Sequence, residues 1–213
     1  MKQRVFLKTE ICIVLVLMAA QVFAVQAPQP KPFSADMTMS TPKGENMTGK
    51  VYYSLPKMRW DMNTHGQNIS MITDGSSQTS YMIMHQQHMY MEMHANQVNP
   101  MARNAPKLQD YASFDPQNPC GKMADVTCKK AGTETVNGRA CDKWVTTDKN
   151  GRVTTAWIDQ KLYFPIKSVT SDGTTMDMTN VKEGAPPAST FELPAGYTKM
   201  DLGSMMGGRK PPQ

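Results

Sequence analysis

The feature that most constrains the fold of this chain is a two-residue alternation of apolar and polar side chains in short runs separated by turn residues. The clearest runs are 33–40, 48–55, 57–62 and 68–73, and no long amphipathic helix is visible. Because the runs are consecutive and joined by tight turns, the strands should form an antiparallel sheet. About ten strands in one domain should curl, so we predict a mainly β fold, a strongly curved incomplete barrel with at most short helices. A short last strand is expected at FELP, 191–194.

Residues 1–27 have the parts of a secretory signal peptide. A basic start precedes the apolar run ICIVLVLMAA, which is short for a membrane span, and small residues suited to cleavage follow at Ala24 and Ala27. We therefore expect a soluble mature protein that is periplasmic or secreted, and not an integral membrane protein. Its β domain should cover 28–202, and the Gly- and Pro-containing tail 203–213 should be disordered.

Charge and motifs exclude several function classes. Removal of the signal peptide leaves 20 basic and 17 acidic side chains, an excess too mild to indicate nucleic acid as a ligand. The sequence contains no G-x-S-x-G, no HExxH and no Gly-rich phosphate loop. We therefore expect neither an enzyme nor a bound cofactor.

Export also affects how the three cysteines of the mature chain are interpreted, because two of them should pair in an oxidising compartment. A two-residue hairpin turn at Asn-Gly 137–138 places Cys141 opposite Glu134, so a Cys128–Cys141 bridge would need a bulge. We favour a Cys120–Cys128 disulfide, with Cys141 free or packed. No CxxC is present, which argues against a zinc or redox site.

The most distinctive local segment is MIMHQQHMYMEMH, residues 82–94, in a chain with 20 methionines. It is predicted to be a β-hairpin. A two-residue turn at Gln86-Gln87 would place five methionines on one side and two histidines on the other, namely Met82, Met84, Met89, Met91 and Met93 against His85 and His88. A four-residue loop flanked by the two histidines is the alternative, because Gln-Gln suits a tight hairpin turn poorly.

Two functions fit this pattern. Methionine is flexible and polarizable, so a methionine stripe suits the wall of an adaptable apolar cavity. Thioether and imidazole groups are also ligands for soft metals, and exported Met/His-rich segments can hold Cu(I) or Ag(I). Methionines elsewhere, such as Met37, Met39 and Met58, also fall at alternate strand positions, and this spread favours the cavity.

A family resemblance is carried by the runs GKVYYSLPKMRWDM and SMITDGSSQTSYMI. Together they resemble the periplasmic lipoprotein carrier LolA and its relatives, through Gly49, Pro56, Arg59, Trp60, Asp74, Gly75 and Tyr81. The run PC…TCKKAGTETVNGRACDKW and the Met-rich YMEM strand look closer to the exported proteins of the DUF4412 type. The resemblance implies an incomplete antiparallel barrel whose apolar concave face holds acyl chains. The helical lid of the carrier is not visible in this sequence.

Arg59 has two roles open to it. An exposed arginine most often forms a solvated pair with a neighbouring carboxylate, here Asp61. In a carrier of the LolA type it would instead face inward at the mouth of the cavity and hold a lid or a polar head group.

The sequence thus predicts an exported binding protein that holds lipid or lipoprotein acyl chains in an apolar concave cavity. The expected ligand-binding residues are Met37, Met39, Tyr53, Met58, Arg59, Trp60, Met82, Met84, Met89 and Met91. The alternative is a Cu(I)- or Ag(I)-binding protein whose ligands come from Met82, Met84, His85, His88, Met89, Met91 and Met93. A third class is a structural protein that binds a protein partner in the envelope.

Overall fold

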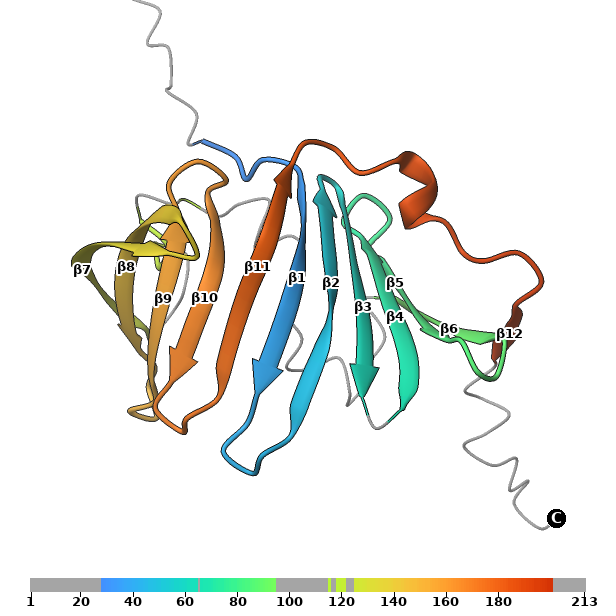
Figure 1. Ribbon diagram of the computed structural model, residues 1–213, viewed down its shortest axis with the longest axis horizontal. Coiled ribbons are helices and arrows are strands. Elements are labelled where there is room, and N and C mark those ends of the chain that lie inside the picture. Colours follow the sequence, from blue (N-terminus) through green and yellow to red (C-terminus); the bar gives the residue numbers. More distant parts are fainter. Residues whose placement is uncertain (1–27, 65, 95–114, 116–117, 122–124, 201–213) are drawn as a thin grey trace, which may run out of the picture.

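In the described part of the chain twelve strands lie side by side in one sheet, which confirms the predicted mainly β fold (Figure 1). The computed structural model describes residues 28–200 except 65, 95–114, 116–117 and 122–124, so the expected signal peptide and tail lie outside the described residues. The strands are β1 (Phe33–Ser40), β2 (Asn46–Ser54), β3 (Lys57–Thr64), β4 (Gln67–Asp74), β5 (Thr79–Met84), β6 (Met89–His94), β7 (Thr127–Val136), β8 (Arg139–Thr147), β9 (Val153–Asp159), β10 (Phe164–Thr170), β11 (Thr175–Glu183) and β12 (Thr198–Met200).

The strand order is β12-β6-β5-β4-β3-β2-β1-β11-β10-β9-β8-β7, so two meanders meet where β1 pairs with β11. Every neighbouring pair is antiparallel, as predicted, except β12 and β6, which run parallel. Antiparallel neighbours can be joined by a tight turn, as most of these strands are. The parallel strand β12 instead reaches its partner β6 after a long connection that begins at the end of β11. The curvature of the sheet stays a prediction.

The predicted hairpin registers are confirmed at two turns. Asn137 and Gly138 have φ values of 52° and 77°, as a type I′ turn requires, and Cys141 lies opposite Glu134. In the other hairpin Met84 pairs with Met89 and Met82 with Met91, with four residues between the two strands. His88 in this loop has a φ of 53°, and its amide bonds to the carbonyl of His85.

The prediction of a strand at FELP is wrong. Phe191 ends a 3₁₀ helix, η2 (Ala188–Phe191), and the last strand is β12. The Phe191 side chain is buried in a cluster with Ile72 and Ile83 of β4 and β5. The two prolines before the helix have no amide hydrogen, so they cannot donate the hydrogen bonds by which a strand pairs with its neighbour. The segment is held instead by the burial of Phe191 against the face of the sheet. Within the described part of the chain, no helix has the length and apolar character of a membrane span.

The main core gathers where the two meanders meet. Phe33, Tyr53 and Phe164 are each at most 1% exposed, and their ring centroids lie 4.9 to 5.8 Å apart. Leu162 and Ile166 pack into the same cluster and are fully buried. Aromatic pairs at such distances add to the free energy gained from burial alone. The core therefore joins β1 and β2 to the C-terminal half of the chain.

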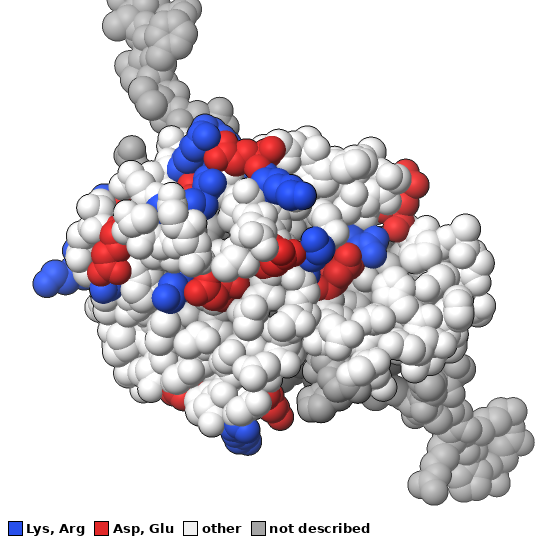
Figure 2. All heavy atoms as spheres, in the orientation of Figure 1, with Lys and Arg blue, Asp and Glu red and all other residues white. Residues whose placement is uncertain are grey.

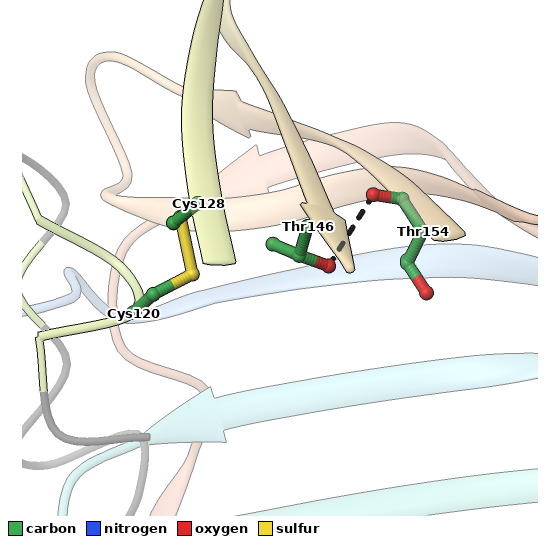
Figure 3. Close-up of a disulfide and its surroundings, with 4 residues drawn as sticks. All are labelled: Cys120, Cys128, Thr146 and Thr154. Carbon is green, nitrogen blue, oxygen red and sulfur yellow. Dashed lines mark hydrogen bonds between the residues drawn. A yellow bond between two sulfur atoms is a disulfide. The ribbon is translucent and has the colours of Figure 1, made fainter. Parts of the chain in front are cut away.

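The predicted Cys120–Cys128 disulfide is present, with 5.9 Å between the two Cα atoms. It ties the segment before β7 to the start of that edge strand (Figure 3). Cys128 pairs in register with Thr146, whose hydroxyl donates to the carbonyl of Thr154 on the next strand. Because an edge strand has neighbours on one side only, the bridge stabilises the outermost part of the sheet.

Cys141 is a free thiol and fully buried, and this burial raises its pKa to about 11. A thiol whose pKa is raised on folding stabilises the protein below its unfolded pKa, near 9, and this contribution is lost as the pH rises through 11. We expect Cys141→Ala to lack this loss, so the difference in free energy of unfolding between the two proteins should change by about 2–3 kcal/mol between pH 8 and pH 11. Urea unfolding at each pH measures it, and a pH-independent difference would contradict the buried thiol.

Charged side chains are mixed in sign over the face of the molecule that Figure 2 presents. Several belong to ion pairs between neighbouring strands, such as Lys50 with Asp36 and Lys143 with Glu134. A surface on which basic groups adjoin acidic groups has no extended field to attract a polyanion.

Candidate functional site

Methionines occupy one face of the sheet. Directly paired residues of neighbouring strands point to the same side, so the register assigns each side chain to a face. One row across the sheet runs through Met71, Met82, Met91 and Met200 of β4, β5, β6 and β12. We call this side the methionine face, and its methionines are Met37, Met39, Met47, Met58, Met62, Met71, Met82, Met84, Met89, Met91, Met93, Met176, Met178 and Met200.

Burial along the methionine face falls from the middle of the sheet towards β5 and β6. Met37 and Met178 belong to the main core and are at most 3% exposed. On β5 and β6 most of the thioethers are only half-buried, namely Met82, Met84, Met89 and Met91. Exposed apolar surface next to a core is what an apolar ligand can cover.

The structure places all but one of the residues predicted to bind an apolar ligand on the same face. The one exception is Arg59, which lies on the opposite face. Tyr53 is fully buried in the core, so it supports the residues of this face and has no exposed surface for a ligand to contact. Trp60 is half-buried, and its indole nitrogen donates to the sulfur of Met58 at 2.6 Å.

Arg59 attaches the C-terminal segment to the other face of the sheet. Its Nε donates to Asp61 at 2.7 Å, and its Nη1 donates to the carbonyl of Thr190 in η2 at 3.0 Å. The Arg59 side chain is only 15% exposed, so it is not a solvated surface residue. The predicted pair with Asp61 is therefore present but largely shielded from solvent. Arg59 does not face inward at the methionine face as the other role requires, and it holds the C-terminal segment on the opposite side of the sheet instead.

Ser70 and His85 form a hydrogen-bonded pair beside Arg59. The Ser70 hydroxyl donates to Asp61 at 2.6 Å and accepts from Arg59 Nη2 at 3.2 Å. With its only hydrogen given to a carboxylate, Ser70 must accept from His85 Nε2 at 2.7 Å, and His85 Nδ1 lies within hydrogen-bond distance of the Tyr197 hydroxyl at 2.9 Å. An imidazole that donates to a serine cannot take its proton. The pair is arranged to hold Tyr197, and not to activate a nucleophile.

The two histidines of the hairpin are therefore separated from its methionines. His85 bonds to Ser70 on the face opposite the methionines, and the ring of the exposed His88 lies 5.2 Å from that of Tyr197. The structure does not bring these imidazoles together with the thioethers of the alternative metal site. Over the described residues, no group of three or more His, Cys, Asp or Glu side chains could hold a metal ion.

An open groove of about 700 Å³ lies along β1 to β4. Most of the residues that line it are polar or charged, among them Asp36, Lys50, Arg59, Asp61 and His85, and a few residues of the methionine face, such as Met37 and Met62, also line it. Its charges are already paired with one another, Lys50 with Asp36 and Arg59 with Asp61. The groove therefore offers no unpaired charge to a ligand among these described residues, and the methionine face is the better candidate site.

Residues 34–163 match the family described as "Domain of unknown function (DUF4412)", which is more than half of the chain. The chain belongs to the DUF4412 family. The match covers β1 to β9 and thus the strands of the methionine face from β1 to β6. The segment that carries Thr190 and Tyr197 lies beyond it. No curated protein matches this DUF4412 chain.

Solved structures share the fold of this DUF4412 protein at low sequence identity. An uncharacterized conserved protein from Thermus thermophilus aligns with a TM-score of 0.55 at 10% identity, over 80% of this chain and 90% of that one. MucB in the Pseudomonas aeruginosa MucA/MucB complex aligns with a TM-score of 0.51 at 16% identity, over 77% of this chain and 56% of that chain. A lipoprotein-sorting protein domain from Vibrio parahaemolyticus reaches a TM-score of 0.35, which is too low to show a shared fold.

Sequence reasoning missed two residues of this DUF4412 protein, Ser70 within the matched domain and Tyr197 beyond it. Strand alternation does place Ser70 on the side opposite Met71, and this is the signal that could have paired it with Arg59 and Asp61. No comparable signal exists for Tyr197, because its contact with His85 spans 112 residues of sequence.

Proposed function

We propose that this protein is an exported, non-catalytic binding protein that holds acyl chains of lipids or lipoproteins against the methionine face. The observation that carries the proposal is the half-buried set of thioethers on β5 and β6, on the same face of the sheet as the apolar residues of the main core. Methionine side chains can repack around chains of different shape. Each methylene group that leaves water contributes about 0.8 kcal/mol, so one acyl chain can supply the free energy of binding.

Three further features support this function. The N-terminal sequence has the pattern of an export signal, and the Cys120–Cys128 disulfide suits an oxidising compartment such as the periplasm. The fold is shared with MucB, and the sequence resembles the lipoprotein carrier LolA. On the side opposite the methionine face, charged groups are paired and the described C-terminal segment is held in place, and we therefore assign the ligand to the methionine face.

Native mass spectrometry of the mature protein, purified from the envelope without detergent, tests this proposal. We expect a family of adducts whose masses differ by methylene units. Met82→Asp or Met91→Asp should remove these adducts, because a carboxylate in the apolar contact must be desolvated when the chain binds. Met82→Leu is the matched control and should keep them, since it preserves apolar volume.

The other outcomes of this measurement each have a meaning. If Met82→Asp keeps the same adducts as the wild type, the acyl chains bind elsewhere and the proposal is wrong. A bare mass in the wild type would also overturn it and direct the search to a protein partner. MucB was solved in complex with MucA, which makes a protein ligand the first alternative to pursue.

A further inference from the structure

The hairpin of β5 and β6 places four thioethers at the corners of a rectangle. Met82 is directly opposite Met91, and Met84 is directly opposite Met89. All four are half-buried on the methionine face. Opposed Cβ atoms are about 5 Å apart, and alternate residues of one strand are about 7 Å apart. The centre of the rectangle is thus roughly 4 Å from each Cβ.

This spacing suits a metal ion bound by sulfur. The sulfur of methionine lies two bonds beyond Cβ on a freely rotating side chain, and metal–sulfur bonds to thiolates are about 2.3 Å long. Three or four of these sulfurs can therefore reach one ion above the centre of the rectangle without any movement of the backbone. Met71 and Met200 continue the row on either side of Met82 and Met91, and they offer further thioethers.

The chemistry of the donors selects the ion. Thioethers are neutral and soft, so they favour Cu(I) or Ag(I) over hard or dipositive ions such as Mg²⁺ or Ca²⁺. The imidazoles of the hairpin do not take part. His85 is bonded to Ser70 and Tyr197 on the opposite side of the sheet, and the ring of His88 also lies beside Tyr197. We propose that Met82, Met84, Met89 and Met91 form an all-thioether binding site for a soft monovalent metal ion. The proposal does not rest on acyl-chain binding.

A second rectangle of methionines in the same sheet gives an internal control. Met37 lies opposite Met178 and Met39 opposite Met176, on β1 and β11. Met37 and Met178 are at most 3% exposed and belong to the core, so an ion could reach their sulfurs only by opening it. Met39 and Met176 are half-buried, so of the two rectangles only the one on β5 and β6 has all four of its thioethers accessible.

The test is a titration of the mature protein with Ag(I), a redox-stable probe, in chloride-free buffer, followed by native mass spectrometry. We expect one tightly bound silver ion per chain. Replacement of Met82, Met84, Met89 and Met91 by Leu should weaken binding by more than the roughly 10–100-fold typical of changes outside the first ligand shell. The matched control, Met39→Leu with Met176→Leu, should bind silver as the wild type does.

Folding and lipid binding are followed in parallel. Leucine keeps the apolar volume, so the four-Leu variant should unfold at nearly the wild-type urea concentration without metal and should keep any methylene-spaced adducts. Undiminished silver binding by the folded four-Leu variant would overturn the site, as would equal loss in the β1–β11 control or no binding by the wild type. A wild-type protein that binds silver but carries no methylene-spaced adducts would overturn the acyl-chain proposal alone.

Discussion

Replacement of Asp159 by Ala should be among the most destabilising single changes in this protein. Asp159 is 1% exposed at the end of β9, and its carboxylate accepts hydrogen bonds from the Arg139 guanidinium and from the amides of Lys161 and Leu162. Removal of one partner from a buried ion pair costs about 3–5 kcal/mol. Urea unfolding of Asp159→Ala at neutral pH should show a loss of that size.

Two further variants show how much of this loss comes from the buried ion pair and how much from the hydrogen bonds of Asp159 to the turn amides. Asp148 accepts from the amides of Asn150 and Arg152 in an exposed turn, so Asp148→Ala should cost much less than Asp159→Ala. Arg139→Met should be nearly as harmful as Asp159→Ala, because it leaves the carboxylate buried without its cation. Equal costs for Asp159→Ala and Asp148→Ala would contradict this account.

Arg139 also connects parts of the sheet that are far apart in sequence. It bonds to Asp159 on β9 and to Glu183 at the end of β11. In the second pair, Arg139 Nη2 lies 3.0 Å from Glu183 Oε1. The loss of either partner should therefore loosen β8 from the strand that carries it. A double-mutant cycle on Arg139 and Asp159 should give a coupling energy of at least about 1 kcal/mol.

Local features of the fold could be predicted from the sequence, because alternation and turn chemistry act over a few residues. The Met82–Met91 register and the Cys141–Glu134 pair both follow from hairpin geometry. The disulfide partner of Cys128 could be inferred by the same means, since that geometry places Cys141 opposite Glu134.

Features that depend on distant contacts could not be predicted. The pairing of β1 with β11 joins residues about 140 positions apart, and nothing in either strand specifies its partner. The local pattern around Phe191 predicts a strand, but burial of this side chain against Ile72 and Ile83 outweighs that pattern. A family motif groups Arg59 with the ligand residues, whereas its register places it on the opposite face.

Gly49 belongs to the same family motif, and the structure explains why a residue without a side chain is needed there. It lies on the methionine face between Met37 and Met62, and a Cβ built on it would be 1.8 Å from the carbonyl oxygen of Asp61. A backbone oxygen cannot turn aside as a side chain can, so β2 and β3 would have to separate. Gly49→Ala should therefore cost at least about 3 kcal/mol or prevent folding.

The neighbouring Thr48 gives the matched control for Gly49. Thr48→Ala changes an exposed residue of the same strand and should cost less than about 1 kcal/mol. Circular dichroism and urea unfolding of the two variants measure the contrast, and wild-type stability in Gly49→Ala would mean that β2 and β3 are not so closely spaced. A folded but weakened Gly49→Ala protein would be informative about the site as well. Separation of β2 from β3 displaces Met62 and Asp61 together, and thus disturbs both the methionine face and the Arg59 contacts behind it.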